Sequence, residues 1–132
     1  MLKYMLDTNI CIYVIKRRPL EVLDKFNLHA GQLSISSITL AELLHGCEKS
    51  EFVEKNIRHV EDFCSRLEVL NYDERAAQHY GAIRAELEKA GKTIGVNDLH
   101  ISGHCRSRAL TLVSNNLREF SRVNGLITTN WV

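Results

Sequence analysis

The amino-acid sequence predicts an α/β fold in which helices connect the short strands of a mainly parallel sheet. Two observations predict it: short apolar runs recur along the chain, and longer amphipathic segments separate them. The 132 residues are 45% hydrophobic, with one proline and seven glycines, and they show no linker, repeat or biased segment. We therefore expect residues 1–132 to form a single domain.

Five short segments have the apolar or alternating pattern of buried strands. The clearest alternation is in the sequence LSIS, where every second side chain is apolar. The predicted strands, in chain order, are Lys3–Leu6, Leu33–Ser36, Glu68–Leu70, Leu110–Val113 and Leu126–Thr128.

The first two helices follow the first predicted strand. Ile10–Lys16 is expected to be helical, because Thr8 or Asn9 can cap its N-terminus. Pro19 suits the first turn of a helix, so the second helix is expected from there to about Asn27.

The longer helices lie further along the chain. Ile38–Lys49 is expected to be helical with Ser37 as its cap, and Glu51–Leu67 shows an apolar stripe at helical spacing. Another helix is expected over Glu74–Ala90, ended by Gly91.

The last helices surround the fourth predicted strand. Gly95 and Asn97 predict a turn, after which Asp98–Arg108 is expected to be helical, and Leu117–Phe120 a short helical turn. Helices between short strands favour parallel pairing, and such sheets bind ligands beyond the carboxyl ends of their strands.

Composition excludes several classes of protein. The 17 basic and 16 acidic residues give a net charge of +1, which argues against a general nucleic-acid coating protein. Lys3 and Asp7 interrupt the apolar start of the chain, so it does not resemble a signal peptide, and no run is long enough to span a membrane. The four cysteines form no CxxC pair, so we expect buried free thiols in a reducing cytoplasm.

Acidic residues recur at predicted strand ends and helix starts, where a parallel sheet forms its ligand-binding site. Asp7 directly follows the first predicted strand, Glu42 lies near the start of a helix, and Asp98 begins another. Asn116 and Glu119 follow the fourth predicted strand. Clustered carboxylates suit Mg²⁺ or Mn²⁺, which prefer oxygen ligands and activate water for phosphodiester hydrolysis. Taken alone, however, Asp7 is equally explained as a helix cap or turn former, Asp98 is better explained as a cap, and Glu42 is an ordinary solvated glutamate.

Four segments of the sequence carry a recognisable pattern: Met5–Asn9, Ser36–Leu43, Gly95–Ile101 and Leu112–Phe120. They occur in the order seen in PIN-domain proteins, and together they resemble the VapC toxins of bacterial toxin–antitoxin pairs. The resemblance extends over nearly the whole chain, including its last three residues, Asn-Trp-Val.

The resemblance implies a three-layer α/β/α PIN domain and a Mg²⁺- or Mn²⁺-dependent endoribonuclease. It implies a structured RNA substrate, often tRNA, whose cleavage stops translation, and the most similar subgroup favours initiator tRNA cut in the anticodon stem-loop. It also implies a VapB-type antitoxin that blocks the site, a homodimer, and contact with operator DNA only through the antitoxin.

Residue by residue, the resemblance assigns metal ligation to Asp7, Glu42 and Asp98. Thr8 and Asn9 match the polar pair beside the first aspartate. The resemblance therefore implies that this pair supports the metal ligands.

The fourth acidic position departs from the family pattern. Ser114 matches the hydroxyl residue that precedes it, but Asn116 stands where many PIN domains have aspartate. Glu119 lies three residues later, on the same face of a helical turn, so we expect it to supply the fourth carboxylate with Asn116 assisting.

Other features leave alternatives open. His100 and His104 have the i, i+4 spacing of zinc ligands, but they fit packed or surface histidines better. Basic residues cluster near Lys16, Arg106 and Arg118, either as solvated charge or as RNA phosphate contacts. Three rival functions also remain: a PIN-like protein that only binds, a DNA-cutting nuclease, and an aspartate-based phosphotransfer enzyme.

Overall fold

The computed structural model describes residues 1–132 and contains one five-stranded sheet in which every strand is parallel to its neighbours. This confirms the predicted α/β class. The strand order is β3–β2–β1–β4–β5, so the first strand is central. The strands are β1 (Tyr4–Leu6), β2 (Leu33–Ser36), β3 (Glu68–Leu70), β4 (Thr111–Val113) and β5 (Ile127–Thr129).

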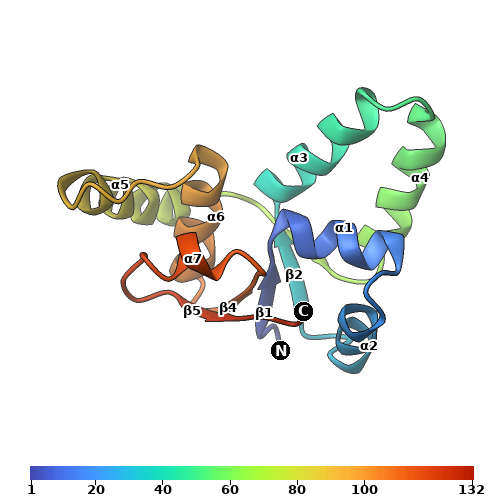
Figure 1. Cartoon of the computed structure of the whole chain (residues 1–132), viewed down its shortest axis with the longest axis horizontal. Helices are drawn as coiled ribbons and strands as arrows, with labels where there is room; N and C mark the ends of the chain where they lie inside the picture. The colour runs from blue at the N-terminus through green and yellow to red at the C-terminus, as the bar shows by residue number, and fades with distance from the viewer.

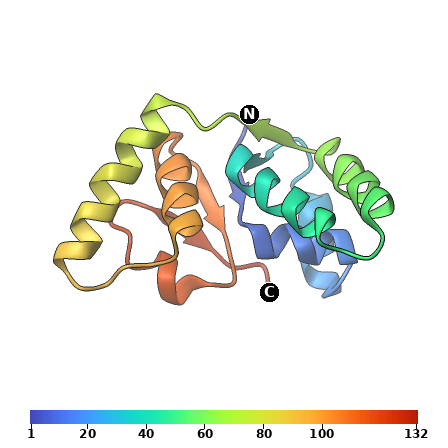
Figure 2. The same cartoon turned by 90° about the horizontal axis from the view of Figure 1, so that it is seen from above.

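Helices cover both faces of the sheet, which gives three layers (Figures 1 and 2). The first group is α1 (Thr8–Lys16), α2 (Leu20–Leu28), α3 (Ser37–Glu48) and α4 (Val53–Cys64). The second group, on the other side, is α5 (Glu74–Lys89), α6 (Val96–Ser107) and α7 (Leu117–Phe120). No helix is both long enough and apolar enough to cross a membrane.

Alternating side chains of the central strand divide the core between the two faces. Tyr4 and Leu6 pack among the residues of α1 to α4, whereas Met5 packs with Ile101 and Phe120 on the side of α6 and α7. Because successive strand residues point to opposite faces, both faces of β1 are buried.

The packing of α5 against α6 depends on a glycine at the point of contact. Gly103 of α6 lies so close to α5 that a Cβ atom there would be 2.7 Å from the backbone nitrogen of Tyr80 and 3.1 Å from the carbonyl oxygen of Ala76. This close approach fixes the position of α6 and therefore of the residues at its N-terminus.

The chain reverses its direction of progress through the sheet at β1. From β1 it proceeds to β2 and β3 on one side, then returns to β4 and β5 on the other. Neighbouring strands whose connections leave in opposite directions open a crevice at their carboxyl ends. The topology therefore places a crevice between the ends of β1 and β4.

Two helix caps differ from the predicted ones. Asp7, rather than Thr8 or Asn9, caps α1, because its side chain accepts the backbone N–H of Ile10. Ser36, rather than the next residue, caps α3 by accepting the N–H of Ile38.

Helix boundaries also differ, most clearly in α4 and α6. The α4 helix, Val53–Cys64, is shorter at both ends than predicted. The α6 helix begins at Val96, so Asn97 lies within it and Gly95 is its cap. Glycine offers no side-chain signal for a cap, which explains why the sequence placed this start too late. All four cysteines are free thiols; Cys11, Cys47 and Cys105 are buried as predicted, whereas Cys64 is half-buried.

Candidate active site

Asp7 lies at the carboxyl end of β1, where its carboxylate is almost completely buried with 4% exposure. One oxygen accepts the N–H of Ile10 at 2.9 Å, and the other accepts the hydroxyl of Ser114 at 2.5 Å. Burial raises the pKa of Asp7 and the negative charge of Glu42 raises it further, while the bonds from Ser114 and Ile10 partly oppose this rise.

Ser114 connects the ends of the two central strands. It follows β4, is fully buried, and donates to the Asp7 carboxylate across a separation of 107 residues. The same hydroxyl oxygen accepts the backbone N–H of Asn116 at 2.8 Å, and the N–H of Asp7 donates to the carbonyl of Val113 at 3.0 Å. Asp7 is therefore held on two sides in the crevice that the topology creates.

Glu42 reaches the same region from the second turn of α3. Its Oε1 atom accepts the hydroxyl of Thr8 at 2.7 Å, and its side chain is half-buried. Thr8 is the first residue of α1, immediately after Asp7. The structure thus brings Glu42 beside Asp7 through a contact between residues 34 positions apart.

Asp98 and Glu119 form the opposite side of the carboxylate group. Asp98 lies in the first turn of α6 and shares a hydrogen bond with the Glu119 carboxyl group of α7. Burial, this bond and the negative charges of Glu119, Asp7 and Glu42 together raise the pKa of Asp98 to about 7. The structure therefore gathers all four acidic residues singled out in the sequence.

The supporting polar residues have different positions. Asn116 donates its side-chain N–H to Glu119 Oε2 at 3.1 Å, so it orients that carboxylate. The side chain of Asn9 is exposed, and this residue reaches Asp7 only through its backbone N–H. Of the two polar residues after Asp7, only Thr8 forms a side-chain hydrogen bond with an acidic residue, Glu42.

Histidines and tyrosines hold α6 in place. His100 Nδ1 lies 2.7 Å from the Tyr72 hydroxyl, and the His100 ring stacks on Tyr80 with ring centres 4.1 Å apart. His104 is fully buried, and its Nδ1 atom lies 2.7 Å from the hydroxyl oxygen of Ser36. Both histidines are packed side chains. Sequence reasoning missed the link from His104 to Ser36, since nothing in either segment signals a contact across 68 positions.

The oxygen donors of the four carboxyl groups suit a hard divalent cation, although the side chains are not oriented to coordinate one ion together. No three Asp, Glu, His or Cys groups lie close enough together to hold an ion as they are oriented. Instead, the raised pKa of Asp98 means that a proton offsets part of the mutual repulsion of the carboxylates. Four carboxyl groups with only oxygen donors are ligands that Mg²⁺ and Mn²⁺ prefer.

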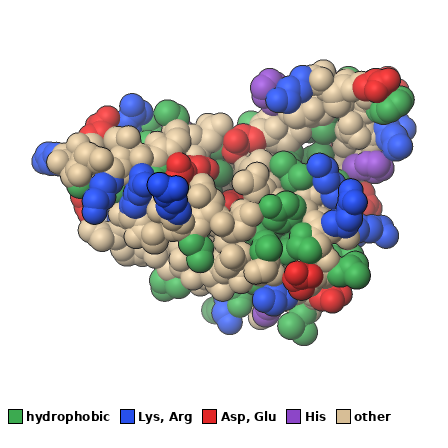
Figure 3. All heavy atoms as spheres, viewed as in Figure 1, with side chains coloured by type: hydrophobic (Ala, Val, Ile, Leu, Met, Phe, Trp, Pro, Cys, Tyr) green, Lys and Arg blue, Asp and Glu red, His purple; other side chains and the backbone are tan.

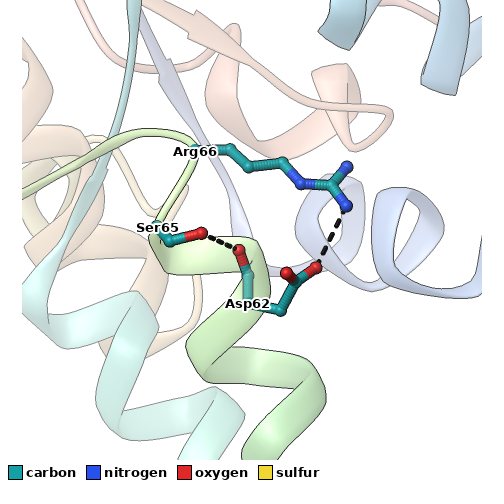
Figure 4. Close-up of polar contacts among 3 residues, drawn as sticks. All are labelled: Asp62, Ser65 and Arg66. Carbon is teal, nitrogen blue, oxygen red and sulfur yellow. Dashed lines mark hydrogen bonds and ion pairs between the residues drawn. The ribbon is translucent and has the colours of Figure 1, made fainter.

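A groove about 420 Å³ in volume begins at Glu42 and runs between α1, α3 and α4. It is lined by Ile12, Ile15, Lys16, Glu42, Leu43, Gly46, Cys47, Asn56, His59 and Val60. A second hollow of about 310 Å³ shares Ile15 and His59 with the groove and has Arg17 and Arg66 on its wall. Arg66 extends from the end of α4, where it pairs with Asp62 at 3.0 Å (Figure 4). The groove is therefore acidic at Glu42 and lined by apolar side chains between the helices, while the second hollow carries Arg17 beside the Arg66–Asp62 ion pair.

Comparisons with known proteins agree with this geometry. The PIN domain family model matches residues 4–126. A Haemophilus influenzae protein named Ribonuclease VapC2 is 64% identical over 132 residues, which covers 100% of both chains. The tRNA(fMet)-specific endonuclease VapC of Shigella flexneri is 54% identical over 131 residues, which covers 99% of each.

Solved structures show the same fold in assemblies. The crystal structure of DNA-bound VapBC from Salmonella typhimurium contains a chain that matches with a TM-score of 0.96 and 52% identity, covering 100% of both chains. The structure of VapBC2 from Rickettsia felis, bound to a DNA fragment from its promoter, matches with a TM-score of 0.94 and 42% identity. That match covers 99% of this chain and 100% of the other.

Proposed function

The chain belongs to the PIN-domain family as a VapC ribonuclease, the toxin of a VapBC toxin–antitoxin system, and from this premise we propose a Mg²⁺- or Mn²⁺-dependent endoribonuclease. The proposed carboxylates are Asp7, Glu42, Asp98 and Glu119. The observation that supports them is their convergence, since the charges of the other three all raise the pKa of Asp98. When bound, the cation neutralises the scissile phosphate and lowers the pKa of a bound water molecule.

The protein's own contribution is to hold these carboxylates in position. Ser114 orients Asp7, Thr8 orients Glu42, and Asn116 orients Glu119, each through a side-chain hydrogen bond of 2.5 to 3.1 Å. Such supporting bonds fix the direction of a ligand oxygen before the substrate arrives.

We propose initiator tRNA as the substrate, cut in its anticodon stem-loop, with inhibition of translation in the cytoplasm as the consequence. The support is that two relatives named tRNA(fMet)-specific endonucleases, from Shigella flexneri and Salmonella typhimurium, are 54% and 53% identical to this chain.

We also propose a VapB-type antitoxin as the partner, with the groove between α1, α3 and α4 as its binding surface. The groove ends at Glu42, so a segment lying in it would reach the carboxylates. Hydrophobic side chains over α1 are visible at the surface in Figure 3. In this proposal the toxin is a homodimer, and operator DNA is contacted through the antitoxin.

The groove assignment is tested with glycines that have open space around their Cα atoms. Gly46 lines the groove and Gly81 lies on α5, and a Cβ atom at either position would meet nothing within 4 Å. Gly46→Gln should weaken inhibition of RNA cleavage by the cognate antitoxin, whereas Gly81→Gln should not. Equal inhibition of both variants would assign the antitoxin to another surface.

Cleavage is tested with the purified protein, freed of any partner, and total tRNA in Mg²⁺ or Mn²⁺. We expect a discrete fragment from one tRNA, lost with EDTA and with Asp7→Asn. The asparagine can still accept the N–H of Ile10 and removes a buried charge, so this variant should fold. Asp24→Asn, an exposed change on α2, is the matched control and should cleave normally. Full cleavage by Asp7→Asn would refute the assignment, and activity on DNA alone would favour the rival DNA nuclease.

A further inference from the structure

Some basic residues of the chain form hydrogen bonds within the protein, whereas others are free to contact a ligand. Arg106 is engaged within the protein, because its Nε atom donates to His79 Nδ1 at 2.9 Å and its Nη1 atom to the carbonyl of Asn124 at 2.8 Å. It therefore serves to hold the segment before β5 against α5 and α6. By contrast, the cations around α7 are largely free.

Three of these cations form what we call the α7 basic patch: Lys92, Arg118 and Arg122. Arg118 lies one residue before Glu119 and is exposed, while Arg122 lies three residues after it. Arg122 donates to the carbonyl of Thr93 at 3.0 Å, which holds the α5–α6 connection, including the exposed Lys92, beside α7. Figure 3 shows Lys and Arg side chains gathered over this part of the molecule, next to acidic side chains near its middle.

The charges of the patch are not neutralised within the protein. The two ion pairs of the chain are Arg66–Asp62 and Arg84–Glu88, and neither includes a cation of the patch. Arg118 makes no side-chain hydrogen bond, although it is adjacent in sequence to a carboxylate of the site. These cations therefore remain available to an external anion.

An RNA strand needs such an attraction here more than elsewhere. The net charge of +1 gives the protein no general affinity for RNA, and the four carboxylates repel phosphates wherever their charge is not fully neutralised. A local group of cations beside the carboxylates overcomes both effects, because phosphate contacts position the nucleic acid on the protein.

We propose that the α7 basic patch binds backbone phosphates of the RNA next to the cleavage point, so that the substrate strand leaves the carboxylates across α7 toward the α5–α6 connection. This inference rests on the proposed ribonuclease function. It assigns to the patch a role in binding and positioning and no role in the chemical step.

The test measures RNA binding by fluorescence anisotropy with labelled bulk tRNA between 50 and 300 mM salt (roughly the range over which such contacts weaken). All proteins carry Asp7→Asn to prevent cleavage. Arg118→Ala/Arg122→Ala is compared with Lys25→Ala/Arg58→Ala, exposed positions on α2 and α4 that change the net charge equally. Arg118→Ala alone removes no side-chain hydrogen bond or ion pair, so it separates binding from any effect on folding.

The slope of log K against log salt is negative, and removal of both patch arginines should reduce its magnitude by about 1.4 to 1.8. Arg118→Ala alone should reduce the magnitude by about 0.7 to 0.9. The control pair should leave the slope nearly unchanged. If the patch variants and the control pair have equal slopes while the wild-type protein cleaves tRNA, the patch proposal is wrong and the ribonuclease proposal stands. If the wild-type protein neither binds nor cleaves RNA, both are wrong.

Discussion

Substitution of Gly103 by alanine tests whether α6, and with it Asp98, is positioned by close contact with α5. The added methyl group would meet backbone atoms, at 2.7 Å from the Tyr80 nitrogen and 3.0 Å from its Cα. Backbone atoms cannot rotate aside as a flexible side chain can, so the two helices must separate. Gly81→Ala on α5 is the matched control, because a Cβ there meets nothing within 4 Å.

The two variants share one favourable effect and differ in one unfavourable effect. Alanine favours a helix interior over glycine by about 1 kcal/mol, and both variants gain this amount. Only Gly103→Ala carries the steric cost of overpacking, about 1–3 kcal/mol. The difference between the variants therefore isolates the steric cost. For a chain of 132 residues, this corresponds to a Tm roughly 3–12 °C lower for Gly103→Ala than for Gly81→Ala.

Thermal unfolding followed by circular dichroism measures this difference, and tRNA cleavage at a temperature where both variants are folded measures its consequence. Asp98 lies on the same helix as Gly103, so a shift of α6 displaces it, and a displacement of about 1 Å costs roughly 100-fold in rate. Equal Tm values and equal cleavage rates for the two variants would show that α6 is not positioned by this contact.

Two further predictions concern the carboxylates. Ser114→Ala removes the hydroxyl that holds Asp7 but leaves the bond from Ile10 to Asp7, so the cleavage rate should fall about 10- to 100-fold without loss of folding. Ser65→Ala removes an exposed hydroxyl and is the control, which should cleave normally. Undiminished cleavage by Ser114→Ala would contradict the positioning role of Ser114. In the metal-free folded protein the pKa of Asp98 is about 7, whereas in the unfolded chain it is 3.8. Between about pH 4 and pH 7 the folded state therefore binds a proton that the unfolded state has released. The free energy of unfolding should consequently decrease as the pH rises through this range. EDTA-treated Asp98→Asn should lack this part of the pH dependence of Tm, and identical pH profiles for the two proteins would refute the assignment.

Much of the fold was predictable because each element has a local signal. The buried strands are short apolar runs, and helices such as α5 are marked by a capping aspartate and a terminal glycine. The strand order was not predictable, since strands of three or four residues carry too few side chains to specify their neighbours. The placement of β1 between β2 and β4 is settled by pairing across the whole chain.

The acidic residues of the site were predictable from their positions at strand ends and helix starts together with the family resemblance. Their supporting contacts were only partly so. Thr8 and Asn9 are adjacent and chemically similar, but in the first turn of α1 the Thr8 hydroxyl faces Glu42, while the Asn9 side chain is exposed. Ser36 and Ser37 present the same ambiguity, because either hydroxyl fits a helix cap until His104 is seen beside one of them.

The bond between Ser114 and Asp7 joins the beginning of the chain to a residue 107 positions later. A fragment that ends between α6 and β4 therefore contains Asp7, Glu42 and Asp98 but lacks Ser114 and Glu119. Because contacts over long sequence separations form slowly, the Asp7–Ser114 contact is expected to form late in folding. Proteolytic removal of the segment after α6 would consequently abolish activity, because the removed segment contains both Ser114 and Glu119.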